Sequence, residues 1–246
     1  MMGAPIPMPD FRVILGDSLE VMSSLPSDFF TAVVTDPPYN SGGFRPNPNA
    51  STTTKYTGLS TSTSSSLSAP DFLGDHYSPR AWRNFISLWL RESYRLLSSS
   101  GVLEVFTDWR QLRDLMDAVE MAGFTTDAPV VWYKPMCRVS DWFYGCEYVV
   151  TAHKGRRPHL PYPRALYSGS APTSRNRRHI TEKPSGLMQH LISPLPRGPI
   201  LDPFLGSGTT GVAALELGHD FVGIELSPHY AAVSHGRLSA VSDSLV

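Results

Sequence analysis

The chain has 246 residues, of which 41% are hydrophobic, and a formal net charge of −1. This length suffices for one large α/β domain with a hydrophobic core, and the near-neutral charge argues against indiscriminate nucleic-acid binding. Cys137 and Cys146 are too few for a disulfide framework or a zinc cluster, so no metal site is expected. No apolar run reaches membrane-spanning length, and residues 1–10 lack signal-peptide features, which predicts a cytoplasmic protein without membrane contact.

Strand-like and helical patterns alternate along the chain. Apolar residues recur at helical spacing over 82–97 and 112–119, and a further helix is expected over 228–240. This alternation predicts a mostly parallel sheet with helices on both faces. Seven strands are expected, near residues 11–15, 31–35, 101–107, 129–134, 147–152, 199–203 and 220–225.

A carboxylate, two prolines and an aromatic residue follow the expected strand at 31–35, as Asp36-Pro37-Pro38-Tyr39. Asp36 can accept a hydrogen bond from an exocyclic amine. The prolines stiffen the turn and lack N–H groups, so that nearby carbonyls stay free to accept a second bond. Tyr39 offers a flat face for a base. The pattern fits the amino group of a nucleobase, although an ordinary strand exit with a capping Asp would look similar.

A glycine-rich turn follows the expected strand at 199–203 and opens a helix. Gly206, Gly208 and Gly211 let the backbone approach a ligand, and a helix N-terminus favours an anionic group. Glu225 ends the next strand, where an acid can bind two ribose hydroxyls. These features predict a half-site for a nucleoside cofactor. The same glycines match the dinucleotide fingerprint, so a nicotinamide cofactor stays open, whereas no Lys-Ser/Thr pair follows to make a P-loop.

Together these stretches resemble the S-adenosylmethionine-dependent DNA amino-methyltransferases, which act on adenine N6 or cytosine N4. Within that family they resemble the beta class, in which the catalytic tetrapeptide precedes the cofactor motif. The resemblance implies a single methyltransferase domain over 1–246 with a circularly permuted, Rossmann-like α/β fold and a seven-stranded sheet. One departure is Ile180, which stands where the family usually has proline. Besides the tetrapeptide, the matching segments are 13–19, 131–135, 147–150, 179–184 and 202–210.

The resemblance also implies S-adenosylmethionine as the cofactor and assigns residues to it. Asp17 is expected to accept from the adenine amine, although a helix N-cap would place an Asp at the same position. Asp202 is expected to orient the glycine loop, and Thr181 and Lys183 to reach the methionine carboxylate. The full expected cofactor set is Asp17, Thr181, Lys183, Asp202, Phe204, Gly206, Ser207, Gly208, Thr209 and Glu225, beside the catalytic set Asp36, Pro37, Pro38 and Tyr39.

Positive charge is concentrated between Lys154 and Lys183, a segment that contains eight Lys or Arg residues and a single acid. Such a patch is the electrostatic footprint of a protein that binds the phosphates of double-stranded DNA, although a solvated loop would look alike. Residues 155–180 are therefore predicted to form a short target-recognition segment. Its candidate DNA contacts are Arg156, Arg157, Arg164, Arg175, Arg177 and Arg178.

Residues 41–75 are rich in serine and threonine, which fill 13 of the 18 positions from 51 to 68. Such a composition cannot bury enough apolar surface to fold alone, which predicts a mobile loop. Its place directly after the tetrapeptide suggests a flap that orders over DNA or over the flipped base.

The predicted function is transfer of a methyl group to an exocyclic amine of a flipped DNA base. Adenine N6 is preferred because Asp36 stands where the family's cytosine-N4 enzymes often have serine. Cytosine-N4 transfer, an RNA or protein-glutamine methyltransferase, an NAD-dependent oxidoreductase and a non-catalytic DNA-binding module remain as alternatives. A homodimer and a cognate restriction nuclease are compatible with the family.

Overall fold

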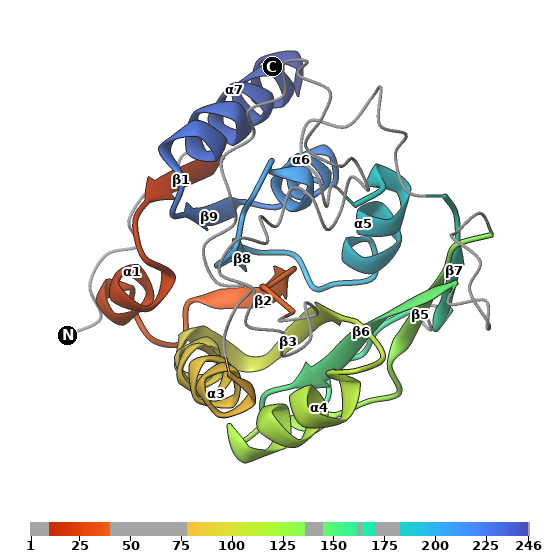
Figure 1. The fold of residues 1–246 in the computed structure, drawn as a ribbon. Coiled ribbons are helices and arrows are strands. Elements are labelled where there is room, and N and C mark those ends of the chain that lie inside the picture. The colour runs from red at the N-terminus through yellow and green to blue at the C-terminus, as the bar shows by residue number, and fades with distance from the viewer. Residues whose placement is uncertain (1–9, 40–77, 136–144, 162–163, 171–182, 246) are drawn as a thin grey trace, which may run out of the picture.

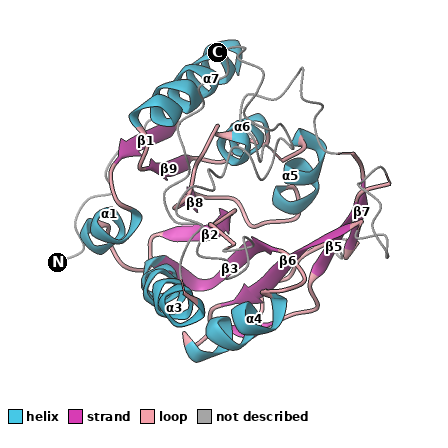
Figure 2. Ribbon diagram, viewed as in Figure 1, coloured by secondary structure: helices cyan, strands magenta, loops and turns pink. Residues whose placement is uncertain are grey.

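A computed structural model describes residues 10–39, 78–135, 145–161, 164–170 and 183–245. One mixed sheet forms the middle layer, and helices cover both of its faces (Figures 1 and 2). The strands are β1 (Phe11–Leu15), β2 (Phe30–Thr35), β3 (Leu97–Thr107), β4 (Thr125–Thr126), β5 (Val130–Tyr133), β6 (Cys146–His153), β7 (Leu166–Ser168), β8 (Ile200–Asp202) and β9 (Phe221–Glu225). The helices are α1 (Ser18–Ser24), α3 (Pro79–Leu96), α4 (Leu112–Met121), α5 (Ser185–Ile192), α6 (Thr209–Glu216) and α7 (Pro228–Leu245).

All seven expected strands are present, but the sheet has nine strands, so the predicted number was wrong. The two additional strands, β4 and β7, are two and three residues long. Segments this short carry no readable periodicity. The helices expected at 82–97, 112–119 and 228–240 correspond to α3, α4 and α7, and the helix expected after the glycine-rich turn is α6. Helix α1 was foreseen only in the alternative role of Asp17 as an N-cap, and α5 was not expected.

The strand order is β1-β9-β8-β2-β3-β6-β5-β7, with β4 paired to β6. The first five strands in this order run parallel, and β6 is antiparallel to β3, β4 and β5. The late strands β8 and β9 therefore lie between β1 and β2, as expected for a permuted Rossmann-like sheet. The consequence is that β2 and β8, which precede the two motifs, are direct parallel neighbours.

Two hydrophobic clusters hold the helices on the sheet. On one face, α1, α3 and α4 contribute buried residues such as Met22, Trp89 and Leu115. On the other face, α5, α6 and α7 contribute residues such as Leu187 and Leu238. Burial of such side chains contributes roughly 1.5–3 kcal/mol each to the stability of the fold. The sheet therefore holds the residues that follow its strands in fixed positions. Within the described ranges, no helix is both long and apolar enough to cross a membrane.

Candidate active site

Four acids predicted to act in the site gather at one edge of the sheet. Asp36 and Asp202 follow or end the neighbouring strands β2 and β8. Glu225 ends β9, and Asp17 follows its neighbour β1, in which Leu15 lies opposite Glu225. The carboxyl ends of adjacent parallel strands form the usual ligand-binding edge of an α/β sheet. The site therefore spans residues that are far apart in the sequence.

The two motifs are joined directly by a hydrogen bond. The Thr35 hydroxyl donates to Asp202 Oδ1 over 2.6 Å, between residues 167 positions apart. Both side chains are buried. Burial raises the pKa of Asp202 to about 6, and hydrogen bonds from Thr35, Thr210 and the Phe204 N–H offset part of that effect. Asp202 therefore connects the strand of the tetrapeptide with the turn of the glycine loop.

Both carboxylate oxygens of Asp36 have partners. The Tyr39 hydroxyl donates to Oδ1, and the Lys183 ammonium donates to Oδ2 over 2.5 Å. The Trp82 indole N–H of α3 donates to the Pro38 carbonyl over 3.1 Å and so anchors the turn. Burial raises the pKa of Asp36, against the opposing effects of Lys183 and Tyr39. Burial and the nearby Asp36 raise the pKa of Tyr39, which keeps its hydroxyl protonated as a donor.

Lys183 connects Asp36 to a second ion pair. Its ammonium lies 3.6 Å from Glu147 Oε2, and Lys134 donates to Glu147 Oε1. The Lys183 side chain is only 9% exposed. Burial alone would lower the pKa of Lys183, but Asp36 and Glu147 outweigh it and hold that pKa above its usual value. Burial would raise the pKa of Glu147, but the two lysines outweigh it and lower that pKa.

Glu147 and Lys134 had no predicted role, although both fall in segments that match the family. Glu147 interrupts the otherwise mainly apolar strand β6, and the register of β5 with β6 brings it opposite Trp132. The sequence did offer a signal for this ion pair: Glu147 is an acid within an expected strand, and Lys134 is a lysine at the end of another expected strand. Lys183 contacts Asp36 of the tetrapeptide and Glu147, and the contact expected between Lys183 and the methionine carboxylate stays a prediction.

Glu225 holds the glycine loop through backbone hydrogen bonds. Gly206 N–H donates to Oε2 and Ser227 N–H donates to Oε1, each over 2.8 Å. Burial raises the pKa of Glu225, and these backbone donors offset part of that rise. Each carboxylate oxygen keeps a further lone pair, so Glu225 has acceptor capacity left for a ligand hydroxyl.

The loop itself depends on glycine at two positions. Gly206 and Gly208 have φ angles of 53° and 83°, in the left-handed region that side chains rarely adopt. Gly208 directly precedes α6, and a Cβ at this position would lie 2.9 Å from the Cβ of Ser234. The loop is therefore pressed against α7 and turned so that α6 begins at the binding edge.

Contacts with α7 and α3 hold the other expected loop residues, which are Ser207, Thr209 and Phe204. Arg237 of α7 donates to the Ser207 carbonyl over 2.7 Å and lies 3.3 Å from the Thr209 hydroxyl. Phe204 packs against Phe85 and Trp89 of α3, with ring centroids 5.8 and 5.6 Å apart. These contacts fix the backbone of the loop. The ring of Phe204 is a structural anchor in addition to any contact with a ligand.

Asp17 occupies the N-cap position of α1. Its Oδ1 accepts from the N–H groups of Leu19 and Glu20 over 2.9 and 3.2 Å. The capping alternative is therefore realised in the structure. The second carboxylate oxygen is not used by these bonds, and a ligand contact for it stays a prediction.

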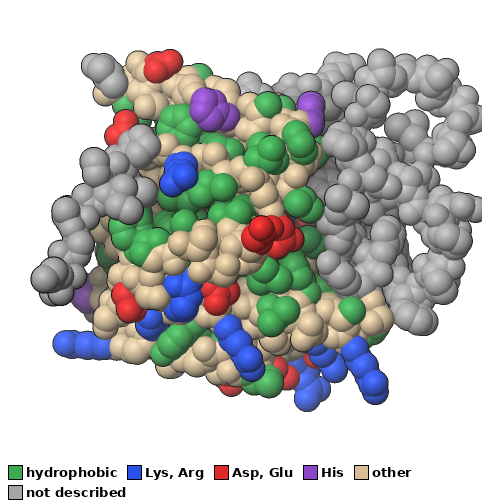
Figure 3. Space-filling view, turned by 90° about the vertical axis from the view of Figure 1, so that its left-hand side faces the viewer, with side chains coloured by type: hydrophobic (Ala, Val, Ile, Leu, Met, Phe, Trp, Pro, Cys, Tyr) green, Lys and Arg blue, Asp and Glu red, His purple; other side chains and the backbone are tan. Residues whose placement is uncertain are grey.

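The basic segment is only partly described, because Arg175, Arg177, Arg178 and Thr181 lie outside the described residues, as does the whole of 41–75. Positive charge also occurs elsewhere: α3 carries four arginines. Figure 3 shows Lys and Arg side chains along the lower border of the face that lies on the left of Figure 1.

Arg156 and Arg157 lie at the edge of the sheet opposite to Asp36. They follow β6. Because β6 is antiparallel to β3, the carboxyl end of β6 lies beside the amino ends of the parallel strands. Lys154 donates to Asp28, which precedes β2, over 2.7 Å. Arg157 also forms an ion pair with Asp127 at 3.2 Å. Both residues therefore follow β6 at the edge of the sheet away from the tetrapeptide.

Arg164 lies on the same side as the tetrapeptide. It comes two residues before Leu166 of β7. Leu166 pairs with Val131 of β5, Val131 pairs with Tyr148 of β6, and Tyr148 pairs with Thr107 of β3, so Leu166 and Thr107 lie at the same height in the sheet. Thr107 ends β3, the neighbour of β2. Arg164 is exposed, so it is the described member of the set that lies nearest in register to the predicted active edge.

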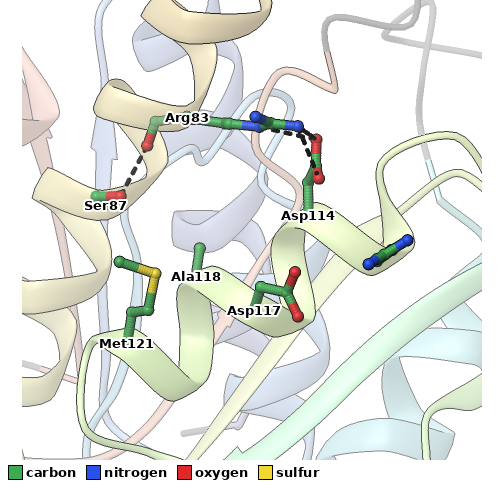
Figure 4. A pocket seen from close by; sticks show the side chains of 7 residues that line it. Arg83, Ser87, Asp114, Asp117, Ala118 and Met121 are labelled. Carbon is green, nitrogen blue, oxygen red and sulfur yellow. Dashed lines mark hydrogen bonds and ion pairs between the residues drawn. The ribbon is translucent and has the colours of Figure 1, made fainter.

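A separate groove of about 540 Å³ lies between α3 and α4 (Figure 4). Arg83 of α3 reaches across it to Asp114 of α4, with N–O distances of 2.9 to 3.1 Å. Ser87, Asp117 and Met121 also line it. None of the residues predicted to bind base or cofactor lines this groove. In the described part of the chain, no cluster of His, Cys, Asp and Glu could hold a metal ion.

Comparison with known proteins agrees with this arrangement. YubD of Escherichia coli (strain K12), whose name describes a methylase, is 30% identical over 242 residues, covering 95% of this chain and 92% of YubD. The structure of the M1.HpyAVI complex with S-adenosylmethionine superposes with a TM-score of 0.67 at 23% identity, over 93% of this chain and 98% of that one. The cytosine-N4-specific PvuII DNA methyltransferase gives a TM-score of 0.68 at 17% identity, over 96% and 93% of the two chains. These two structures establish a shared fold.

The family assignment comes from a match over most of the chain. The family model described as DNA methylase, for the N6 and N4 methyltransferases, matches residues 30–235. The match includes the tetrapeptide, the glycine loop and the strands that carry them. The chain therefore belongs to the N6/N4 DNA methylase family.

Proposed function

We propose that this chain transfers a methyl group from S-adenosylmethionine to N6 of an adenine flipped out of double-stranded DNA. One observation carries the proposal: the carboxylate of Asp36 lies beside the strand that opens the glycine loop, joined to it by the bond from Thr35 to Asp202. A base-binding acceptor and a cofactor loop on neighbouring strands are what direct transfer between two bound molecules needs.

Asp36 acts on the amine of the target base. The lone pair of that nitrogen is conjugated with the ring, which makes the amine a poor nucleophile. Hydrogen bonds from its two N–H groups to Asp36 and to the Pro37 carbonyl favour a pyramidal nitrogen and stabilise the positive charge that develops on it. A preorganised group of this kind contributes on the order of 3 kcal/mol. Transfer forms the N–CH3 bond as the S–CH3 bond breaks and leaves the neutral thioether S-adenosylhomocysteine. The methylated nitrogen then becomes neutral by releasing one proton to solvent.

The turn is prepared for this role. Trp82 already occupies the Pro38 carbonyl, whereas the Pro37 carbonyl has no donor within the described part of the chain. Tyr39 is oriented by its hydrogen bond to Asp36, and in this proposal its partly buried ring stacks on the base. Because the target amine is inaccessible in the duplex, the base must leave the stack at a cost of a few kcal/mol, which stacking partly recovers.

The residues of the second motif suit a nucleoside sulfonium. Glu225 has lone pairs left to accept from ribose hydroxyls, Asp17 has an unused carboxylate oxygen, and the backbone of Gly206 and Gly208 permits close approach. S-adenosylmethionine supplies an electrophilic methyl group in such a site. The structure of the fold neighbour M1.HpyAVI contains this cofactor. NAD, which the same glycine spacing also fits, would leave the tetrapeptide without a role.

Adenine N6 is preferred over cytosine N4 because of the residue that begins the tetrapeptide. The family's cytosine-N4 enzymes often have serine at that position, and this chain has Asp36. Cytosine N4 is the second candidate, favoured by the shared fold with the PvuII enzyme.

Nucleoside analysis tests the proposal. Unmethylated genomic DNA is incubated with the protein and methyl-labelled S-adenosylmethionine, digested, and separated by mass spectrometry. We expect N6-methyldeoxyadenosine, formed at least about a hundredfold more slowly by Asp36→Ala. N4-methyldeoxycytidine would replace adenine with cytosine as the substrate. Label in RNA or in glutamine side chains, but not in DNA, would overturn the proposal. Calorimetry with S-adenosylmethionine and with NAD checks the cofactor separately.

A further inference from the structure

The ammonium of Lys183 lies between two carboxylates at unequal distances. It is 2.5 Å from Asp36 Oδ2 and 3.6 Å from Glu147 Oε2. The first distance is a charge-assisted hydrogen bond, and the second is an ion pair too long for one. The rings of Tyr39 and Phe106 lie 5.2 and 5.0 Å from the ammonium and close the space around it. The lysine therefore has a second carboxylate within a short movement of its present position.

Glu147 presents an acceptor that is not yet used. Oε1 receives the Lys134 ammonium, but Oε2 is buried and accepts no hydrogen bond in the described part of the chain. Buried polar atoms in folded proteins nearly always have a partner, since an unsatisfied one costs free energy. Glu147 Oε2 is therefore an acceptor without a donor, 3.6 Å from an ammonium that could supply one.

The present contact conflicts with the chemistry proposed for Asp36. The target amine must donate to this carboxylate, which keeps a free lone pair on each oxygen but already holds the positive charge of Lys183 at Oδ2. Positive charge then develops on the amine nitrogen. An ammonium held against the same carboxylate repels that charge, and the repulsion is strong in a buried site where little water screens it.

We propose that Lys183 passes its hydrogen bond from Asp36 to Glu147 when the target base enters, and that Glu147 is thereby a positioning residue for methyl transfer. In the free protein, Lys183 neutralises Asp36 in its buried site. In the complex, the base amine takes the position at Asp36 Oδ2, and Lys183 completes the coordination of Glu147 Oε2. This inference rests on the catalytic role proposed for Asp36.

A double-variant cycle tests whether Lys183 moves its hydrogen bond from Asp36 to Glu147. In Glu147→Gln the alternative acceptor loses its charge, so Lys183 stays at Asp36, and we expect kcat to fall about tenfold or more while the affinity for S-adenosylmethionine is unchanged. Adding Lys183→Met to this variant removes the retained ammonium. The double variant should then be several-fold faster than Glu147→Gln alone. Two losses that simply multiply would overturn the inference, because they would mean that each residue only supports the fold.

A pH profile gives a second measurement. Because Glu147 helps to hold the pKa of Lys183 high, its replacement should let Lys183 lose its proton at a lower pH. The kcat of Glu147→Gln should therefore recover as the solution becomes alkaline, and neither the wild type nor the double variant should show this rise. A flat ratio of wild-type to Glu147→Gln rates across pH would contradict the inference.

Controls separate the failure modes. Glu120→Gln makes the same chemical change on the exposed surface of α4, and it should leave kcat and its pH profile unchanged. If Asp36→Ala retains full activity, the proposed function of Asp36 fails and this inference fails with it. If Asp36→Ala is inactive but the double variant shows no recovery, only the inference about Lys183 and Glu147 fails.

Discussion

The two halves of the candidate site, the proposed base side around Asp36 and the proposed cofactor side around Glu225, are built in different ways. Around Asp36, side-chain charges balance one another through Lys183, Glu147 and Lys134. Around Glu225, a carboxylate is fixed by backbone N–H groups of Gly206 and Ser227. The first arrangement depends on long side chains that can exchange partners. The second depends on backbone geometry that is already in place.

This difference matches the two tasks. A cofactor that is bound in the same way in every reaction cycle gains from a preformed loop, since little ordering is then needed on binding. A base that enters from a duplex must replace existing contacts, and a set of balanced ion pairs allows that exchange without leaving a buried charge uncompensated. Substitutions on the two sides should therefore affect different measured quantities.

The largest effect is expected on the base side, for Asp36→Ala. Methyl transfer should fall by at least about a hundredfold, because one preorganised acceptor is lost. Affinity for S-adenosylmethionine should change little. Single-turnover methylation and calorimetry on the same protein check both expectations. Near wild-type transfer by this variant would remove Asp36 from the mechanism.

Glu225→Ala should produce the converse result on the cofactor side. We expect binding of S-adenosylmethionine to weaken by roughly 1–3 kcal/mol, because ribose hydroxyls and the Gly206 N–H both lose their acceptor. Transfer at saturating cofactor should stay within a few-fold of wild type. Glu225→Gln is the matched control, since it keeps an acceptor oxygen, and its loss should be smaller. Unchanged affinity in calorimetry for both variants would count against this placement.

Glu104 differs from Asp36 and Glu225 because it is a buried acid with no ion pair or hydrogen bond among the described residues. It lies on β3, and its Oε2 accepts no hydrogen bond in the described ranges. Burial raises its pKa to about 8, so the folded protein keeps a proton that the unfolded chain releases near pH 4.5. The free energy of unfolding should therefore fall as pH rises from about 5 to 8, by at most roughly 1.4 kcal/mol per unit from this group.

Glu104→Gln mimics the protonated acid and should remove that part of the fall. In urea unfolding, the stability of the variant relative to the wild type should be higher at pH 8.5 than at pH 5.5, because over this range the unfolded wild-type chain has released a proton that the folded protein keeps. Other titrating groups are common to both proteins and cancel in the difference. An equal difference at both pH values would show that Glu104 keeps an ordinary pKa in the folded state.

The smallest expected effect concerns one arginine. Arg164 is exposed and lies on the tetrapeptide side of the sheet, whereas Arg156 lies at the opposite edge. If Arg164 contacts a phosphate, Arg164→Ala should reduce the slope of log affinity against log salt concentration by about 0.9, and Arg156→Ala should not. Equal slopes for both variants and the wild type would direct the search for DNA contacts to Arg175, Arg177 and Arg178.

The parts that sequence could predict are those coded locally. A few neighbouring residues suffice to identify the buried strand before Asp36, the glycines before α6 and the acid at the end of β9. The contact between Lys183 and Asp36 joins positions 147 residues apart, and it depends on strand order and helix placement. The edge on which Arg156 lies depends on the antiparallel direction of β6, which an apolar run does not reveal.

The strand order also determines when during synthesis this protein can fold. The sheet neighbour of β1 is β9, and β2 gains β8 as its second neighbour only after most of the chain has been made. At a ribosomal rate of about 5–20 residues per second, β1 waits roughly 10 to 40 s for its partner. During that interval the nascent chain has neither a completed sheet nor an assembled site, so a ribosome that stalls before β8 releases no active enzyme. Early strands with exposed edges are prone to pair with other chains, which makes this interval the point at which we expect a demand for chaperones.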